Sequence, residues 1–65
     1  MTAAEVHELT ERERIEEWRR EELERAGYPS DAAGELAVRH DIDLHGAVEL
    51  VERGCPPEIA TRILL

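Results

Sequence analysis

The stretch "ERAGYPSDAA" at residues 24–33 decides the fold, because it separates a long charged segment from an alanine-rich one. Gly27 can adopt the left-handed backbone conformation with which helices commonly end. Ser30, which follows a proline, has a side chain that can cap a new helix. We therefore expect one helix over about residues 11–26 and a second over about residues 31–40.

Capping signals predict the remaining helix boundaries. Thr10 and Glu13 have the spacing of a capping box, in which each side chain bonds the backbone N–H of the other residue. Asp43 can cap a third helix and Gly54 can end it, while Pro57 suits the first position of a fourth. These two helices are expected over about residues 44–53 and 57–64.

The charges support helix along nearly the whole chain. Six of the eight arginines have a glutamate four residues before them, which is the favourable orientation for an ion pair on a helix. The pairs are Glu8–Arg12, Glu16–Arg20, Glu21–Arg25, Glu35–Arg39, Glu49–Arg53 and Glu58–Arg62. The fold class is therefore all-α, with most charges on solvated helix faces.

Residues 1–10 form an acidic extension in which Thr2 and Glu5 repeat the capping-box pattern. In one continuous helix, the apolar residues of this extension would lie opposite those of the helix that follows. The two sets are Val6 and Leu9 before Thr10, and Ile15, Trp18, Leu23 and Ala26 after it. Either the helix breaks near Thr10, or it carries a second, small apolar patch.

Two apolar features remain to be placed. Trp18 shares a face with Ile15, so we expect it to pack in the core rather than to act as an interface anchor. The chain ends in "RILL", residues 62–65, which is costly to leave in water. We expect this end to fold back over Ile15 and Trp18, or to pair with a second copy.

Length and charge exclude several classes of function. Sixty-five residues form one domain with a small core, which leaves little room for a substrate pocket, so we expect neither an enzyme nor a cofactor. The net charge of −8 repels nucleic acid and anionic lipid.

No apolar run approaches the roughly 20 residues that span a bilayer. One cysteine cannot form an internal disulfide, and the N-terminus lacks a secretory signal, so a cytoplasmic setting is expected. A composition without Lys, Asn, Gln or Phe is typical of a GC-rich, actinobacterial-type bacterial genome.

Two short motifs have the residue types of chemistry. "HDIDLH" at residues 40–45 gathers imidazoles and carboxylates that could bind a metal, but it matches no standard ligand spacing. Helix capping by Asp43 with solvated histidines is the simpler interpretation. Cys55 in "GCPP" could serve as a haem ligand or nucleophile, but a lone cysteine is more often a small buried thiol. We expect no metal and no catalytic residue.

Residues 26–56, "AGYPSDAAGELAVRHDIDLHGAVELVERGCP", resemble the ubiquitin-associated (UBA) domain family. The family has a Met-Gly-Phe/Tyr loop, a small residue five positions after the aromatic, an Ala-Val pair and often a Gly-x-Pro tail. The matching residues are Gly27-Tyr28-Pro29, Ala33, Ala47-Val48 and Gly54-Cys55-Pro56. The resemblance implies a UBA-like three-helix bundle, here with an N-terminal helical extension and a short fourth helix, so that residues 11–65 form the bundle.

The resemblance also implies a contact surface, made by the loop after the first helix and the end of the third. On this chain the protein-binding residues would be Ala26, Gly27, Tyr28, Pro29, Leu50, Val51 and Gly54. Tyr28 could be a contact residue, or a plug between helices whose hydroxyl stays in water. Ala26 and Glu52 replace apolar contacts of the family, Met and Leu, which argues against ubiquitin as the partner.

Together these features predict a non-catalytic protein–protein interaction module or small adaptor. Its acidic rim would suit a partner with basic residues. One alternative is a structural protein that forms homodimers or small oligomers, using the extension before the first helix and the "RILL" end to complete its core. Another is an acidic regulator that competes for a basic surface.

Overall fold

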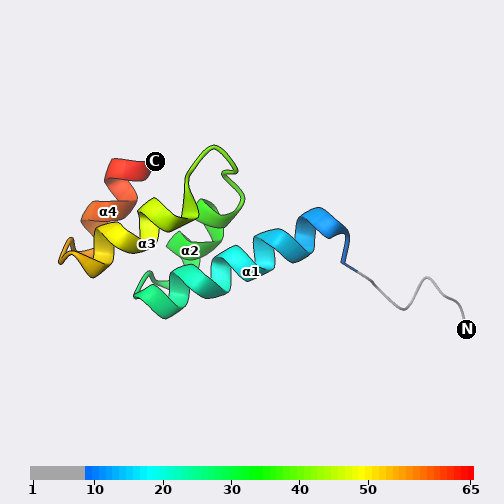
Figure 1. Ribbon diagram of the computed structural model, residues 1–65, viewed down its shortest axis with the longest axis horizontal. Coiled ribbons are helices and arrows are strands. Elements are labelled where there is room, and N and C mark those ends of the chain that lie inside the picture. Colours follow the sequence, from blue (N-terminus) through cyan, green and yellow to red (C-terminus); the bar gives the residue numbers. More distant parts are fainter. Residues whose placement is uncertain (1–8) are drawn as a thin grey trace, which may run out of the picture.

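The computed structural model describes residues 9–65, and this part of the chain is all-helical (Figure 1). Its helices are α1 (Glu11–Ala26), α2 (Ser30–Ala37), α3 (Leu44–Glu52) and α4 (Pro57–Leu64). The expected boundaries of α1 and α4 are confirmed, and α3 ends one residue early. Several expectations concern residues 1–8 and lie outside the described residues. They are the Thr2–Glu5 capping box, the Glu8–Arg12 pair, Val6 and most of the acidic extension.

Helix α1 begins at a capping box. Thr10 Oγ1 accepts a hydrogen bond from the Glu13 N–H (3.1 Å), and Glu13 Oε1 accepts one from the Thr10 N–H (2.9 Å). Thr10 itself has an extended backbone, with φ −70° and ψ 167°. Of the two alternatives for this segment, the structure therefore shows the break at Thr10.

Helix α1 ends at Gly27, as the sequence predicts. The Gly27 N–H donates to the Glu24 carbonyl (3.0 Å) and the Tyr28 N–H to the Leu23 carbonyl (3.0 Å). These two bonds form a Schellman motif, which satisfies the last carbonyls of the helix. Gly27 has φ 124°, a backbone conformation that residues other than glycine rarely adopt.

Two glycine substitutions should have opposite effects on stability. At Gly27 an added Cβ would meet only ordinary contacts, the nearest at 3.7 Å, so the cost of Gly27→Ala is the backbone strain of about 1–3 kcal/mol. Gly34 lies inside α2 with open space around it, so Gly34→Ala should stabilise by about 0.5–1 kcal/mol. Urea unfolding of both variants checks this, and two shifts of the same sign would contradict it.

Helix α2 is shorter than expected. The sequence predicts residues 31–40 with Ser30 as the cap, but the helix runs from Ser30 to Ala37 and its N-cap is Pro29, without a side-chain cap. Ser30 Oγ donates instead to Glu24 Oε2 (2.9 Å). At the C-terminal end of the helix, the guanidinium of Arg19 donates a hydrogen bond to the Ala37 carbonyl (3.0 Å). This carbonyl is one that a longer helix would use for its next backbone bond.

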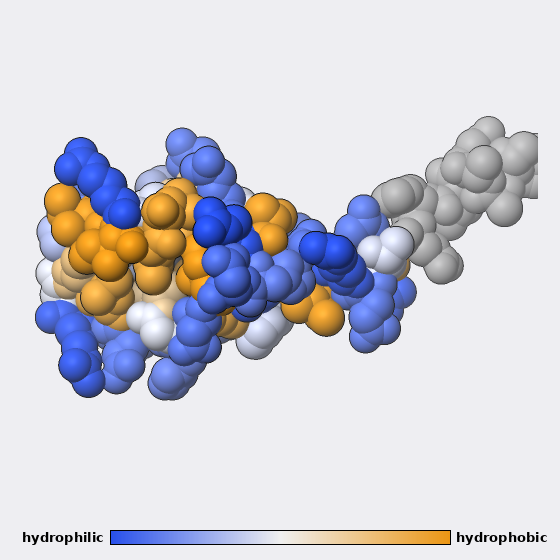
Figure 2. Space-filling view, turned by 90° about the horizontal axis from the view of Figure 1, so that it is seen from above, coloured by the Kyte–Doolittle hydropathy of each residue, from blue (hydrophilic) through white to orange (hydrophobic). Residues whose placement is uncertain are grey.

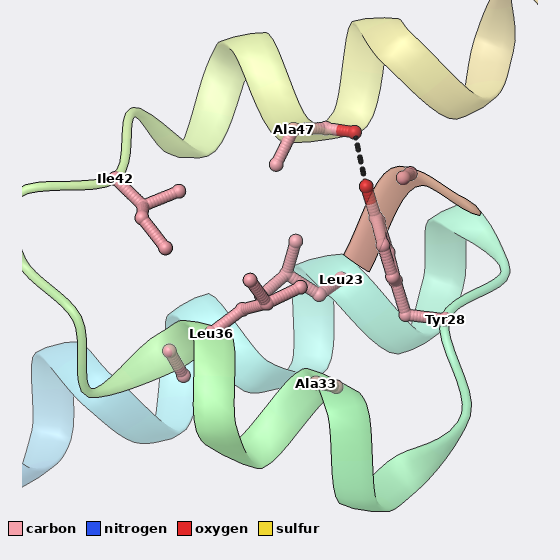
Figure 3. Packing of buried hydrophobic residues seen from close by; sticks show 8 residues of the cluster. Leu23, Tyr28, Ala33, Leu36, Ile42 and Ala47 are labelled. Carbon is pink, nitrogen blue, oxygen red and sulfur yellow. Dashed lines mark hydrogen bonds between the residues drawn. The ribbon is translucent and has the colours of Figure 1, made fainter. Parts of the chain in front are cut away.

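The core lies where α1, α2 and α3 meet, with one residue from α4 (Figure 3). The buried residues are Leu23, Tyr28, Ala33, Leu36, Ala37, Ile42, Ala47 and Ala60. Half of them are alanines, which let helix backbones approach closely but contribute little apolar area. Leu23 and Leu36 are the largest fully buried side chains. The stability of the fold therefore depends on a few large side chains.

The expected core position of Trp18 is wrong. Trp18 is 54% exposed and Ile15 is 45% exposed, because the N-terminal half of α1 projects beyond the other helices (Figure 1). The buried Leu23 lies about 140° around the helix from Trp18 at 100° per residue, so Trp18 lies on a side of α1 that faces away from the core. Glu16 and Arg19, on either side of it in the sequence, do reach the loop after α2. The C-terminal end does not cover this region either, since α4 packs on α3 and α2.

The fluorescence of Trp18, the single tryptophan, tests this position. We expect an emission maximum close to that of free tryptophan in water and ready quenching by acrylamide, because more than half of the side chain is exposed. Unfolding in urea should then move the maximum very little. A blue-shifted emission that moves to the red on unfolding would show Trp18 to be buried.

The expected ion pairs are mostly wrong in register. Among residues 9–65, Glu49–Arg53 (3.0 Å) is the one predicted pair that forms. The other helical pairs are Arg12–Glu16 (3.3 Å), Glu17–Arg20, Arg20–Glu24 (2.7 Å) and Glu22–Arg25 (2.6 Å). Exposed pairs contribute about 0–1 kcal/mol each, so the exchange of partners costs the helices little.

Candidate protein-binding surface

The corner between α1 and α2 lies beside the end of α3, and both carry the residues predicted to bind a protein. Of these, Gly27, Pro29 and Gly54 are exposed, Ala26, Leu50 and Val51 are half-buried, and Tyr28 is buried. A Cβ added to Gly27 would lie 3.7 Å from Val51 Cγ1 and 4.0 Å from Pro57 Cγ. The structure therefore brings the loop and the end of α3 together.

Tyr28 is a plug between the helices. Its side chain is 3% exposed, and its hydroxyl donates a hydrogen bond to the Ala47 carbonyl of α3 (2.8 Å), as Figure 3 shows. The expectation that this hydroxyl stays in water is wrong. Burial, with a smaller contribution from the charge of Cys55, raises the pKa of Tyr28. The ring thus fixes the loop to α3 and leaves contacts with a partner to Tyr28's neighbours.

A shallow, open hollow of about 290 Å³ lies at this corner, lined by Gly27, Pro29, Pro57 and Glu58. Two of these residues come from the predicted loop and two from the start of α4. The sequence predicted that Pro57 begins a helix but not that this helix starts against the loop. The proline itself is the available signal, because a rigid first turn fixes where α4 begins.

A smaller hollow of about 130 Å³ lies on the other side of Ala26. Its lining residues are Glu22, Arg25, Ala26, Val48 and Glu52. Arg25 pairs with Glu22 (2.6 Å), which leaves Glu52 as the free charge at this edge among the described residues. Each of the two hollows near the corner therefore has one acidic side chain without an ion-pair partner among the described residues, Glu52 in the smaller and Glu58 in the larger.

The far end of the bundle is held by α1. Arg19 donates three hydrogen bonds, to the carbonyls of Ala37 (3.0 Å), Arg39 (3.1 Å) and Ile42 (2.8 Å). The expectation that most charges lie on solvated helix faces does not hold for Arg19. A signal was available, because Arg19 is one of two arginines without a glutamate four residues before it.

Glu16 holds the same loop through His40, whose Nε2 lies 2.7 Å from Glu16 Oε2. The hydrogen bond from His40 is the main cause of a lowered pKa of Glu16, with Arg12 adding to it. A carboxylate whose pKa is depressed by folding stabilises the fold above its unfolded pKa, and this stability is lost as the pH falls through the folded pKa.

The pH dependence of unfolding should therefore change in Glu16→Gln. The wild type should lose stability as the pH falls below about 4.5, the ordinary value for this carboxyl, and the variant should show a shallower loss over the same range. Thermal unfolding between about pH 3 and pH 7 checks this, with Glu13→Gln on the exposed cap as the comparison. Parallel curves for wild type and Glu16→Gln would contradict the assignment.

The motifs with possible chemistry have structural roles. Asp43 Oδ2 accepts from the Gly46 N–H (3.0 Å), so the predicted cap of α3 is confirmed. Arg39 pairs with Asp41 (3.2 Å) and so lowers the pKa of that carboxyl. Within residues 9–65, no three His, Cys, Asp or Glu side chains lie close enough to hold a metal ion. Cys55 is half-buried, and its Sγ lies 3.6 Å from the Pro56 carbonyl oxygen.

No family model, curated protein or solved structure matches this chain significantly. The function of the corner is therefore inferred from its geometry alone. Among the described residues, no helix has the length and apolarity required to cross a bilayer.

Proposed function

We propose that this chain is a small, non-catalytic protein-interaction module. Its contact surface, called the corner surface below, consists of Ala26, Gly27, Pro29, Val51, Gly54, Pro57 and Glu58. The observation that carries the proposal is the buried Tyr28–Ala47 hydrogen bond. This hydrogen bond holds in place a loop in which Gly27 and Pro29 are exposed beside an open hollow. A preorganised loop loses little conformational entropy when a partner binds.

The UBA-like interpretation belongs to the same proposal. The Gly27-Tyr28-Pro29 loop lies against Val51 at the end of α3, which is the arrangement that the resemblance implies. Leu50 is half-buried and packs against the core, so we assign it to support of α3 rather than to contact. A bacterial, cytoplasmic setting remains part of the proposal, on composition alone.

The charge of the corner favours a partner with basic residues. Glu52 and Glu58 each line one of the two hollows near the loop, and the whole chain carries −8. Complementary charge speeds association and selects among partners more than it adds affinity. The corner surface is well below the roughly 800 Å² per partner of a standard interface, so binding is expected to be modest and transient.

Two charge reversals test the corner surface. Glu58→Arg changes the hollow, whereas Glu35→Arg makes the same change at an exposed position of α2 away from it. Both variants and the wild type would be immobilised and exposed to a lysate of the native host, after their folding is confirmed by circular dichroism. Proteins retained by wild type and Glu35→Arg but lost with Glu58→Arg support the proposal. Identical capture by all three proteins would contradict it.

A further inference from the structure

Helix α4 carries an uncovered stripe of two isoleucines. Ile59 and Ile63, one helical turn apart, are 42% and 62% exposed, and Leu65 is 48% exposed. The fully buried Ala60 lies about 100° around the helix from Ile59 and about 60° from Ile63, so the stripe borders the side of α4 that faces the core. Figure 2 shows hydrophobic residues gathered at the end of the molecule where α3 and α4 lie. An exposed apolar surface on a short helix indicates a site of interaction with another molecule.

The charge distribution indicates which partner fits. Residues 55–65 contain one acidic and one basic side chain, Glu58 and Arg62, so their side chains sum to zero. Residues 1–54 therefore carry the entire net charge of −8. Two copies of a chain with this net charge repel each other overall. The side chains of α4 add nothing to that repulsion.

The charges of α4 are also self-complementary. At 100° per residue, Glu58 and Arg62 lie on the same side of the Ile59–Ile63 stripe. In an antiparallel pair of helices related by a two-fold axis, equivalent sides of the two stripes meet, because the contact is isologous. Glu58 of one copy then faces Arg62 of the other. Among the described residues, neither has an ion-pair partner within one chain.

We propose that two copies of this chain associate through α4, packed antiparallel, with the Ile59–Ile63 stripes in contact and two Glu58–Arg62 pairs across the axis. This inference does not rest on the proposed function. The face is well below the area of a standard interface, so the dimer is weak, with a dissociation constant between about 10 µM and 1 mM.

Because Glu58 also lines the corner hollow, dimer formation engages one residue of the corner surface. A high local concentration of the chain would therefore compete with a partner that uses Glu58. The competition is reciprocal, since each binding event weakens the other by the same factor.

Sedimentation equilibrium over about 10 µM to 1 mM tests the dimer. Wild type should change from monomer to dimer over this range. Ile63→Glu should weaken association at least about tenfold, because it places one carboxylate from each copy, two in all, in the apolar contact. Val38→Glu is the matched control, since Val38 is 52% exposed at the end of α2, and it should behave as wild type. Wild type that stays monomeric throughout, or a dimer dissociated by Val38→Glu and not by Ile63→Glu, would overturn the proposal.

Charge exchange tests the antiparallel arrangement independently of the apolar contact. Glu58→Arg and Arg62→Glu should each weaken the dimer, because like charges then face each other across the axis. The double variant Glu58→Arg/Arg62→Glu restores opposite charges and should recover most of the wild-type affinity. If the double variant is as weak as the single ones, the antiparallel pairing is wrong. These residues are exposed, so the test holds even if Ile63→Glu fails to fold.

Discussion

Tyr28→Ala should unfold most of the protein at room temperature. The Tyr28 side chain is 3% exposed and packs with Leu23, Leu36 and Ala47 in the core. Removing a buried aromatic ring costs about 3–5 kcal/mol. A domain of this length has a total stability of only about 3–10 kcal/mol. Since half of the buried residues are alanines, this fold belongs near the lower end of that range.

The variant Tyr28→Phe separates the contribution of the aromatic ring to stability from the contribution of the hydroxyl. This change keeps the ring and removes the bond to the Ala47 carbonyl, which should cost about 1 kcal/mol. Urea unfolding followed by circular dichroism gives both values. A Tyr28→Ala protein with the stability of wild type would contradict the core position of Tyr28, and equal losses in the two variants would contradict the packing role of the ring.

Arg19→Ala should be the second most damaging change. It removes three hydrogen bonds from one guanidinium to the carbonyls that follow α2. Bonds to charged groups contribute about 1.5–3 kcal/mol each, but two of the three bonds are only partly buried and one is exposed, so water replaces much of their strength. We expect a total loss of about 2–3 kcal/mol.

The control for Arg19 lies on the same helix. The Arg14 side chain is exposed and makes no hydrogen bond or ion pair with the described residues, so Arg14→Ala should change stability by no more than about 0.5 kcal/mol. Arg19→Lys should recover less than half of the loss, because one ammonium group lacks the planar fork that reaches three carbonyls. Amide exchange in residues 38–43 should rise in Arg19→Ala alone. Equal stability of the Arg19→Ala and Arg14→Ala proteins would show that the three hydrogen bonds of Arg19 contribute nothing to the stability of the fold.

Helix ends were predictable where a local side chain or backbone rule determines them. The capping box at Thr10, the cap at Asp43 and the stop at Gly27 each depend on residues within five positions. The end of α2 was not predictable in this way. It depends on Arg19, whose guanidinium reaches a carbonyl 18 residues away in the sequence.

The candidate site shows the same division. The sequence placed Gly27 and Val51 on one surface, and the two residues are adjacent. It left Tyr28 between two roles, because an aromatic residue after a helix can turn inward or outward without changing the local pattern. It missed Pro57 and Glu58, whose position depends on how α4 packs against α3 and α2. Trp18 was misplaced because the apolar residues of α1 spread over about 140° of the helix, and the side near Leu23 is the one that is buried.

The most direct test of the corner surface is a photo-crosslinking experiment in the native host. A photoreactive amino acid would replace Glu58 in the corner hollow, and in a second protein Glu35, which is exposed on α2. We expect a crosslink from position 58 to a larger partner protein, separate from any crosslinked dimer, and none from position 35. Crosslinks of equal yield from both positions, or from position 58 to a second copy alone, would contradict the assignment of the corner as a protein-binding surface.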